Sequence, residues 1–295
     1  MSRWMIGNIG VDRVAELEGP LFPPAAVFPD FDPEILAQHG DDLVPAHYAP
    51  DLGLVLGTIQ SYVIRTGTKT ILVDTCCGNH KERPDEPPFH QLNTPYLERL
   101  AALGVRPEDV DYVLCTHLHV DHVGWNTMLD NGRWVPTFPN ATYVFSQADL
   151  DYLLDLKKMG PPHAGFAVQY DDSIAPIIEA RRSRMIEADQ ALTPELDIAF
   201  EPGHTPGHII LKARSQGEGA LFIGDVIQHP FQLYRPDWNS SHCALPEMAR
   251  TARRNVLEQC IREDLLMFPA HFAYPYAFRI DRREGGYALR SQAKL

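Results

Sequence analysis

The side chains best suited to chemistry are three histidines and one aspartate that lie close together in the segment HLHVDH. His117, His119, Asp121 and His122 stand at offsets of 0, 2, 4 and 5 along the chain. Imidazole and carboxylate groups are the ligands that zinc and related divalent metals take from proteins. By chance such a pattern arises in on the order of a few chains per thousand. The segment therefore predicts a metal site.

The spacing inside this cluster suits two metal ions that lie close together. Residues two apart in an extended segment project to the same side, so His117 and His119 can bind one ion. Asp121 and His122 lie where the chain turns towards a helix, and they can bind a second ion. In two-metal hydrolases the ions lie about 3.5–4 Å apart, so one short segment has to supply ligands to both.

Three later residues each follow a predicted strand and can complete the site. His204 lies in EPGHTPGH, between two pairs of proline and glycine that restrain the backbone. Asp225 ends the apolar strand ALFIGD, where a carboxylate needs a cation or several hydrogen bonds. His271 lies in FPAHF, directly after another apolar strand. Each residue alone is weak evidence, but together they favour a site with seven ligands.

The elements that must position these residues alternate between groups of strands and single helices. Residues 1–50 are rich in proline and acids, and we expect an irregular N-terminal arm packed on a single domain of residues 51–295. Residues 159–182 form a mixed insert, and Gly285-Gly286 should close a hairpin. Helices are expected to begin at Thr94-Pro95, Ser146 and Pro246. Strands are expected near 52–74, 112–116, 142–145, 184–187, 196–201, 208–213, 219–226 and 265–269.

This pattern predicts an α/β chain of the α+β type. Two β-rich halves, each with its own helices, would pack as a four-layer αββα sandwich. The run ILVDT is apolar and ends in a carboxylate, as a buried strand does when it delivers Asp74 to a functional edge.

The composition describes an acidic globular protein. Hydrophobic residues make up 44% and charged residues 22%, and 39 acids against 26 bases give a net charge of −13. An acidic surface repels phosphate backbones and anionic membranes, so we expect a small-molecule partner and neither nucleic acid nor membrane. Five cysteines without a CxxC pair indicate reduced thiols. With no signal-peptide pattern and no long apolar run, a cytoplasmic location is expected, and a homodimer is left open.

In combination, these motifs resemble those of the metallo-β-lactamase superfamily. The resemblance rests on HxHxDH, a histidine within PGHTPGH, a GD pair after a strand and a late histidine, and it covers roughly residues 52–275. It implies that Asp74, in VDTCCG, orients the metal-binding segment and does not bind metal. It also implies one metal held by His117, His119 and His204, a second held by Asp121, His122 and His271, and a bridge between them made by Asp225 and a hydroxide.

The types of the expected ligands indicate which metals the site can bind. Imidazole and carboxylate suit two Zn²⁺ per chain but also tolerate Mn²⁺, Fe²⁺ or Co²⁺. His119 stands where the di-iron, flavin-linked branch of the superfamily has a glutamate, which disfavours that branch. Two cations lower the pKa of a shared water, so that a hydroxide is available to attack a carbonyl or phosphoryl group. Asp121 would then move the proton as a catalytic residue.

The subfamily follows by exclusion. Asp225 argues against true β-lactamases, which lack this carboxylate, and the 82 residues from His122 to His204 are many for a glyoxalase-II-like thioesterase. The acidic charge argues against nucleases. We therefore expect a lactonase-like or esterase-like hydrolase of a small, fairly apolar substrate. Alternatives are phosphotriester or thioester hydrolysis at the same site, a persulfide dioxygenase-like redox enzyme with one iron, and a metal-bound protein without turnover.

One departure from the lactonases of this group follows Asp225. They place a tyrosine three residues beyond this aspartate, whereas this chain has Gln228 and then His229. We interpret His229 as a catalytic group that stabilises an oxyanion or leaving group, with a structural hydrogen bond as the alternative. Aromatic side chains near the metal-binding segments are predicted to line an apolar substrate pocket: Trp125, Phe231 and Tyr274, together with Trp238 and Phe272.

Overall fold

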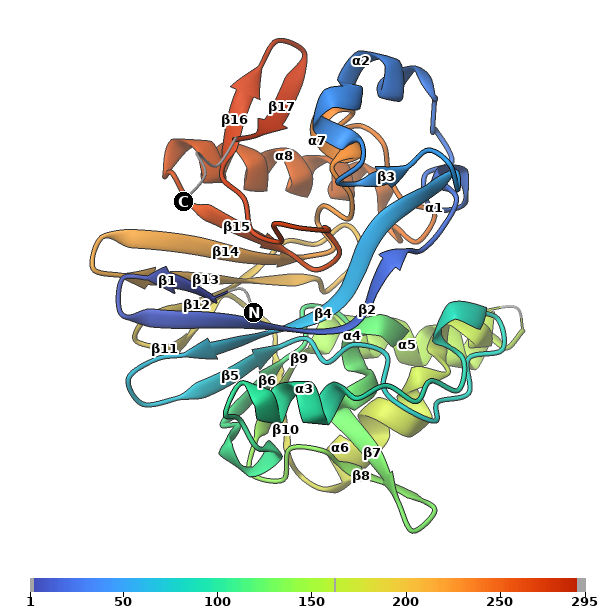
Figure 1. Cartoon of the computed structure of the whole chain (residues 1–295). Coiled ribbons are helices and arrows are strands. Elements are labelled where there is room, and N and C mark those ends of the chain that lie inside the picture. Colours follow the sequence, from blue (N-terminus) through green and yellow to red (C-terminus); the bar gives the residue numbers. More distant parts are fainter. Residues whose placement is uncertain (1–2, 162, 291–295) are drawn as a thin grey trace. The chain divides into compact units, whose positions relative to one another are not determined.

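Residues 3–161 and 163–290 are described by the computed structural model, and their contacts divide the chain into two compact units (Figure 1). The first unit combines Met1–Leu17 with Ile59–Asp189, and the second combines Glu18–Thr58 with Gln190–Leu295. Each unit therefore contains residues from the first 58 positions. The division into an arm of residues 1–50 and one domain stays a prediction.

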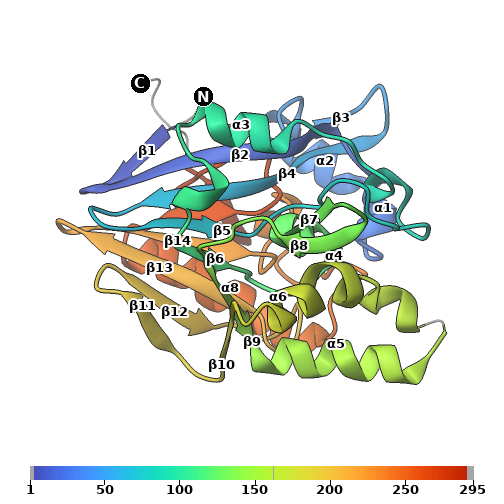
Figure 2. The same ribbon diagram turned by 90° about the horizontal axis from the view of Figure 1, so that it is seen from below.

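The sheet of the first unit is ordered β1-β2-β4-β5-β6-β9-β10, and Figure 2 shows β4, β5 and β6 side by side. β4 and β5 pair antiparallel, whereas β5, β6, β9 and β10 pair parallel. Because the carboxyl ends of β5 and β6 reach the same edge, the segments that follow them begin side by side. The strands are β1 (Arg3–Ile6), β2 (Ile9–Pro20), β4 (Leu54–Arg65), β5 (Thr70–Val73), β6 (Tyr112–Leu114), β9 (Thr142–Ser146) and β10 (Ser183–Ile186).

The helices of the first unit are mostly short. The Ser146 side chain accepts a hydrogen bond from the Asp149 backbone N–H and begins a helix, as the sequence predicts. Thr94 does not cap its helix, because Pro95 occupies the N-cap position; the Thr94 hydroxyl donates to Glu16. The helices and the outer hairpin are α3 (Tyr96–Ala102), α4 (Val120–Val123), α5 (Gln147–Met159), α6 (Ala175–Glu179), β7 (Thr127–Asp130) and β8 (Arg133–Pro136). The insert also holds a π-helical turn, Tyr170–Ile174.

The second unit contains a sheet ordered β11-β12-β13-β14-β15, in which only β15 pairs parallel. The helix α8 (Pro246–Arg262) covers one face of this sheet (Figure 1), and it buries Ala249, Ala252, Val256 and Cys260 at helical spacing. The expected C-terminal hairpin is formed by β16 and β17. The elements are β11 (Gln190–Thr193), β12 (Leu196–Phe200), β13 (Ile209–Ser215), β14 (Glu218–Gly224), β15 (Leu266–Pro269), β16 (Ile280–Arg283), β17 (Gly286–Leu289), β3 (Tyr48–Ala49), α1 (Pro24–Val27), α2 (Glu34–Leu43) and α7 (Phe231–Tyr234).

The prediction of irregular chain at the N-terminus is wrong for much of its length. Residues 3–20 form β1 and β2, and α1 and α2 follow. β2 buries two acidic side chains, Asp12 and Glu16, which interrupt the alternation of apolar residues that identifies a strand. Throughout the described chain, no helix has the length and apolar character that crossing a membrane requires.

A buried polar cluster ties the insert to the segment that follows β5. The Lys81 ammonium group donates to Thr127 Oγ1 (2.6 Å) and to the Asp172 carbonyl oxygen (2.8 Å), and it lies 3.6 Å from the centre of the Trp134 ring. Arg83 donates two hydrogen bonds to the Asp172 carboxylate, at 2.7 and 2.9 Å. Two cations thus share one carboxylate, and burial lowers the pKa of Lys81 to about 7.

This cluster predicts a pH dependence of stability. The pKa of Lys81 is 10.5 in the unfolded chain and about 7 in the folded protein, so between these values the unfolded chain binds more protons. Stability therefore rises with pH in this window. Relative to Lys81→Met, the wild-type free energy of unfolding should increase by about 1 kcal/mol per pH unit from pH 7 to 8.5. Urea denaturation of both proteins measures this, and a difference that does not change with pH contradicts it.

Candidate metal centre

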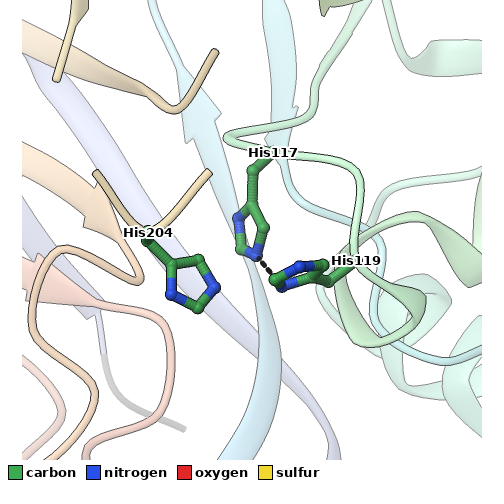
Figure 3. A group of neighbouring side chains, drawn as sticks. All are labelled: His117, His119 and His204. Atoms are coloured by element: carbon green, nitrogen blue, oxygen red, sulfur yellow. Dashed lines mark hydrogen bonds between the residues drawn. The ribbon is translucent and has the colours of Figure 1, made fainter. Parts of the chain in front are cut away.

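The HLHVDH segment follows β6 and enters the first turn of α4. His117 Nε2 lies 3.0 Å from His119 Nδ1, and the two rings point toward one another (Figure 3). The ring centres of His117 and His122 are 4.0 Å apart, and Asp121 Oδ1 lies 3.6 Å from His122 Nε2. The structure thus gathers four donor side chains in one loop; residues 116–125 are called the ligand loop below. Figure 3 also draws His204, which belongs to the second unit.

The carboxylate of Asp74 fixes the start and the middle of the ligand loop. It accepts hydrogen bonds from the Thr116 backbone N–H (2.7 Å) and the Thr116 hydroxyl (2.9 Å), and it lies 2.9 Å from His122 Nδ1. With Nδ1–H of His122 donating to this carboxylate, Nε2 presents its lone pair to a metal. Asp74 itself adopts φ +58°, a conformation that is unfavourable outside glycine and that these hydrogen bonds compensate.

A turn of residues 74–78 packs directly against the ligand loop. The Thr75 backbone N–H donates to the His122 carbonyl (2.8 Å), and the Trp125 backbone N–H donates to the Thr75 carbonyl (2.8 Å). Gly124 approaches so closely that a Cβ atom there would lie 1.7 Å from the Cys77 carbonyl oxygen. A side chain at position 124 would therefore push the two segments apart.

The second unit brings together three of the expected ligands, because His204 and His271 both lie beside Asp225, which follows β14. Asp225 Oδ1 lies 2.9 Å from His271 Nε2, and Asp225 Oδ2 lies 3.4 Å from His204 Nε2. His271 Nδ1 donates to the Thr58 carbonyl oxygen (3.0 Å), which orients the ring. The Asp225 backbone N–H donates to Nε2 of His208 (3.1 Å), the second histidine of PGHTPGH.

The chemistry of these donors fits divalent metal ions. The described donors are imidazole nitrogens and carboxylate oxygens, the set that suits zinc. His122 and His271 each hold a hydrogen-bond acceptor with Nδ1, so that Nε2 faces the neighbouring donors, as in metal-binding histidines. A ring nitrogen of His117 faces a ring nitrogen of His119, and a cation bound by both nitrogens would stabilise this arrangement. Both groups of donors therefore support a metal cofactor.

His229 has a different environment from the one expected. It is buried, its Nδ1 accepts a hydrogen bond from the Phe231 backbone N–H (3.2 Å), and its Nε2–H donates to the His47 carbonyl (2.8 Å). Both ring nitrogens therefore have partners within the second unit. Its neighbour Gln228 instead contacts the expected bridge, because its Nε2 donates to Asp225 Oδ2 (2.8 Å). The catalytic role of His229 stays a prediction, and the observed hydrogen bonds are those of its structural alternative.

The aromatic residues expected in a substrate pocket have different surroundings. Trp125 is 5% exposed, and its ring stacks on Tyr96 with centres 5.1 Å apart. Phe231 is fully buried in the core of the second unit, whereas Tyr274 is 69% exposed on the chain that follows His271. Their role in a substrate pocket stays a prediction. Of the three side chains, only that of Tyr274 is exposed, as contact with a substrate requires.

Sequence reasoning missed several residues that support the ligands. Thr116 directly precedes His117, and its hydroxyl donates to Asp74. Gly124 follows HLHVDH within two residues. Cys243 lies with its Sγ 3.6 Å from His204 Nδ1. The position of Gly124 beside the cluster was a usable signal, because glycine often marks a close approach of two backbones. Nothing near Cys243 in sequence indicated its contact.

The family model of the metallo-β-lactamase superfamily matches residues 54–271. The chain belongs to this superfamily.

The curated relatives are N-acyl homoserine lactonases. The enzyme of Bacillus cereus is 26% identical over 176 residues, which are 56% of this chain and 62% of that enzyme. AiiB of Agrobacterium fabrum is 35% identical over 107 residues, which are 31% of this chain and 38% of that enzyme. The chain thus spans less than two thirds of the length of the curated relatives that it matches.

Solved structures resemble the chain over nearly its whole length. AidC, a dizinc quorum-quenching lactonase, has a TM-score of 0.82 at 19% identity, with 100% of this chain and 98% of AidC covered. The hydrolase AbOPH of the β-lactamase superfamily has a TM-score of 0.81 at 23% identity, with 99% and 97% covered. At these identities the likeness shows the fold, and it confirms the expected α+β class.

The buried histidines of the second unit predict sensitivity to acid. Burial lowers the pKa of His47 to about 4 and that of His229 to about 3, from the usual 6.5. Between these values and pH 6.5 the unfolded chain binds more protons, so stability falls as the pH falls below 6.5. Relative to His229→Gln, the wild-type protein should lose about 1 kcal/mol of unfolding free energy per pH unit from pH 6 to 4.5.

Urea denaturation in saturating zinc measures the unfolding free energy of the wild type and of His229→Gln. Any release of metal at low pH affects these two proteins alike. His242→Gln, at an exposed histidine, is the matched control and should follow the wild type. The interpretation is wrong if His229→Gln and the wild type lose stability in parallel.

Proposed function

We propose that the chain is a metal-dependent hydrolase that opens a lactone or cleaves a related ester bond in a small, fairly apolar substrate. The observation that carries the proposal is the group around Asp225, whose two carboxylate oxygens face His271 and His204. With metal ions bound at these histidines, such a carboxylate would be able to supply one oxygen to each of two ions. The redox alternative with one iron has no such support.

The proposal assigns two Zn²⁺ ions to each chain, with Mn²⁺, Fe²⁺ or Co²⁺ as chemically acceptable substitutes. Each ion needs three protein donors and a further position for water or substrate. The ligands of one ion are His117, His119 and His204, those of the other are Asp121, His122 and His271, and Asp225 is shared. When bound, the two cations lower the pKa of a water between them and polarise the carbonyl oxygen of the substrate.

The side chains of the ligand loop then divide the remaining tasks. The Asp121 side chain is 16% exposed, whereas that of its neighbour His122 is 1% exposed, so solvent reaches Asp121 more easily than His122. Its carboxylate takes up the proton of the attacking water and returns it to the leaving alkoxide. Asp74 keeps His122 in its orientation, because it binds both this ring and the backbone before His117.

The substrate class rests on the relatives. The curated matches act on N-acyl homoserine lactones, and AidC is a dizinc lactonase. A cyclic ester with an acyl chain combines a carbonyl group for the metals with an apolar part, and we propose this class for the chain. The partner is thus a small molecule; cytoplasmic location and a homodimer stay predictions.

A substrate panel tests the proposal. The zinc-loaded protein should hydrolyse N-acyl homoserine lactones and simple γ-lactones with higher kcat/KM than thioesters or phosphotriesters. Asp121→Asn should lower kcat by about 10²-fold or more, because both a ligand and the proton acceptor are lost. Asp130→Asn, in the exposed hairpin β7–β8, is the control and should keep wild-type activity. The absence of hydrolysis of every substrate by protein with bound zinc would refute the proposed function.

A further inference from the structure

The carboxylate of Glu16 is buried inside the first unit and is surrounded by hydrogen-bond donors. Glu16 lies on β2 and is 2% exposed. Its Oε1 accepts from the Trp125 indole N–H (2.6 Å) and the Thr94 hydroxyl (3.0 Å). Its Oε2 accepts from the backbone N–H groups of Cys77 (2.7 Å) and Gly78 (3.4 Å). Four donors from three separate segments of the chain thus meet at one side chain.

Two of these segments are the ones that pack against each other beside the ligands. Cys77 and Gly78 end the turn of residues 74–78, and Trp125 ends the ligand loop. The Gly124 backbone N–H donates to the Cys76 carbonyl (2.7 Å), so the turn and the loop are joined directly as well. One oxygen of Glu16 accepts from the turn and the other accepts from the loop, and the carboxylate therefore links the two segments.

The backbone of Glu16 is itself restrained. The Arg99 guanidinium donates to the carbonyl oxygens of Ala15 (2.7 Å) and Glu16 (3.0 Å). No lysine or arginine of the described chain bonds the Glu16 carboxylate, and burial raises its pKa. Burial of a carboxylate without a cation lowers the stability of the folded protein. A protein retains such a group where its hydrogen bonds fix the position of neighbouring segments.

We propose that Glu16 is a positioning residue of the metal centre, which holds the ligand loop through Trp125 and Cys77 so that Asp121 and His122 bind metal. The inference rests on the metal site of the proposed function. Trp125 follows His122 by three residues, whereas His117 is next to Thr116, which Asp74 holds. Release of Trp125 should therefore disturb Asp121 and His122 more than His117 and His119. One of the two metals should weaken and the other should stay.

Glu16→Gln is the decisive variant, because the amide has the shape of the carboxylate but only one accepting oxygen. Its NH₂ group must face either the Trp125 indole N–H or the backbone N–H groups of Cys77 and Gly78, and the hydrogen bonds from those donors are lost. Asp12→Asn is the matched control on the same strand. Asp12 is equally buried, at 2%, and pairs with Arg3 and Arg65 without contacting the ligand loop.

Zinc affinity is measured on the full chain by competition with a chelator, with circular dichroism as the check on folding. For Glu16→Gln we expect one zinc to bind about 10–100-fold more weakly, as happens when a group that orients a ligand is lost. The absorption bands of the cobalt-substituted protein should change for the same metal. Asp12→Asn should keep both affinities within about twofold and the cobalt spectrum unchanged, although its ion pairs are lost.

Three results would overturn the inference. The first is wild-type zinc affinity in Glu16→Gln, and the second is an equal loss in Asp12→Asn, which would indicate general destabilisation. If Glu16→Gln does not fold, Trp125→Phe is the second variant, because it removes the indole N–H and keeps an aromatic ring against Tyr96. Unchanged zinc affinity in Trp125→Phe is the third result. Wild-type protein that binds zinc without hydrolysing any substrate refutes the proposed function alone, whereas protein that binds no zinc refutes both.

Discussion

The hydrogen bonds of Asp74 are the contact on which the ligand loop depends. Because β5 and β6 are parallel neighbours, the residue after β5 meets the loop after β6, and one carboxylate reaches both Thr116 and His122. Histidines and acids that converge this closely lose their hydration, which is unfavourable without a cation or fixed partners. The strained backbone of Asp74 shows that the fold maintains this arrangement at some cost. The parallel pairing of β5 and β6 therefore places Asp74 where it can hold the ligand loop.

The second unit uses the same physical principle with different groups. His271 is oriented by the carbonyl of Thr58, and Asp225 is held by His208 through its backbone and by Gln228 through its side chain. The backbone N–H groups of Gln228 and His229 are in turn bound by Gln232. In both units the ligands thus leave the ends of strands, and polar side chains from neighbouring segments fix their direction. Such orientation is what tunes metal affinity.

The sequence was most informative where residues combine a specific chemistry with a position at a strand end. The gathering of His117 to His122 in one loop and the helix begun by Ser146 follow from local spacing and local capping, whereas the orienting role of Asp74 was implied by the resemblance to the superfamily. Glu16 could not be recognised, because its importance arises from donors that are distant in sequence. The same applies to Thr94, which is of a residue type that caps helices but lies before the N-cap residue Pro95 and donates to Glu16. His229 has the right chemistry for catalysis, yet only three-dimensional structure shows that both its nitrogens are bound.

The central claim is the proposal that seven side chains serve two metal ions, and metal content tests it most directly. Protein purified without chelator and then saturated with zinc should contain close to two zinc ions per chain by elemental analysis. His204→Ala and His271→Ala, which each remove one ligand of a different ion, should reduce this content towards one. A wild-type content that stays at one zinc per chain, with full hydrolytic activity, would contradict the account.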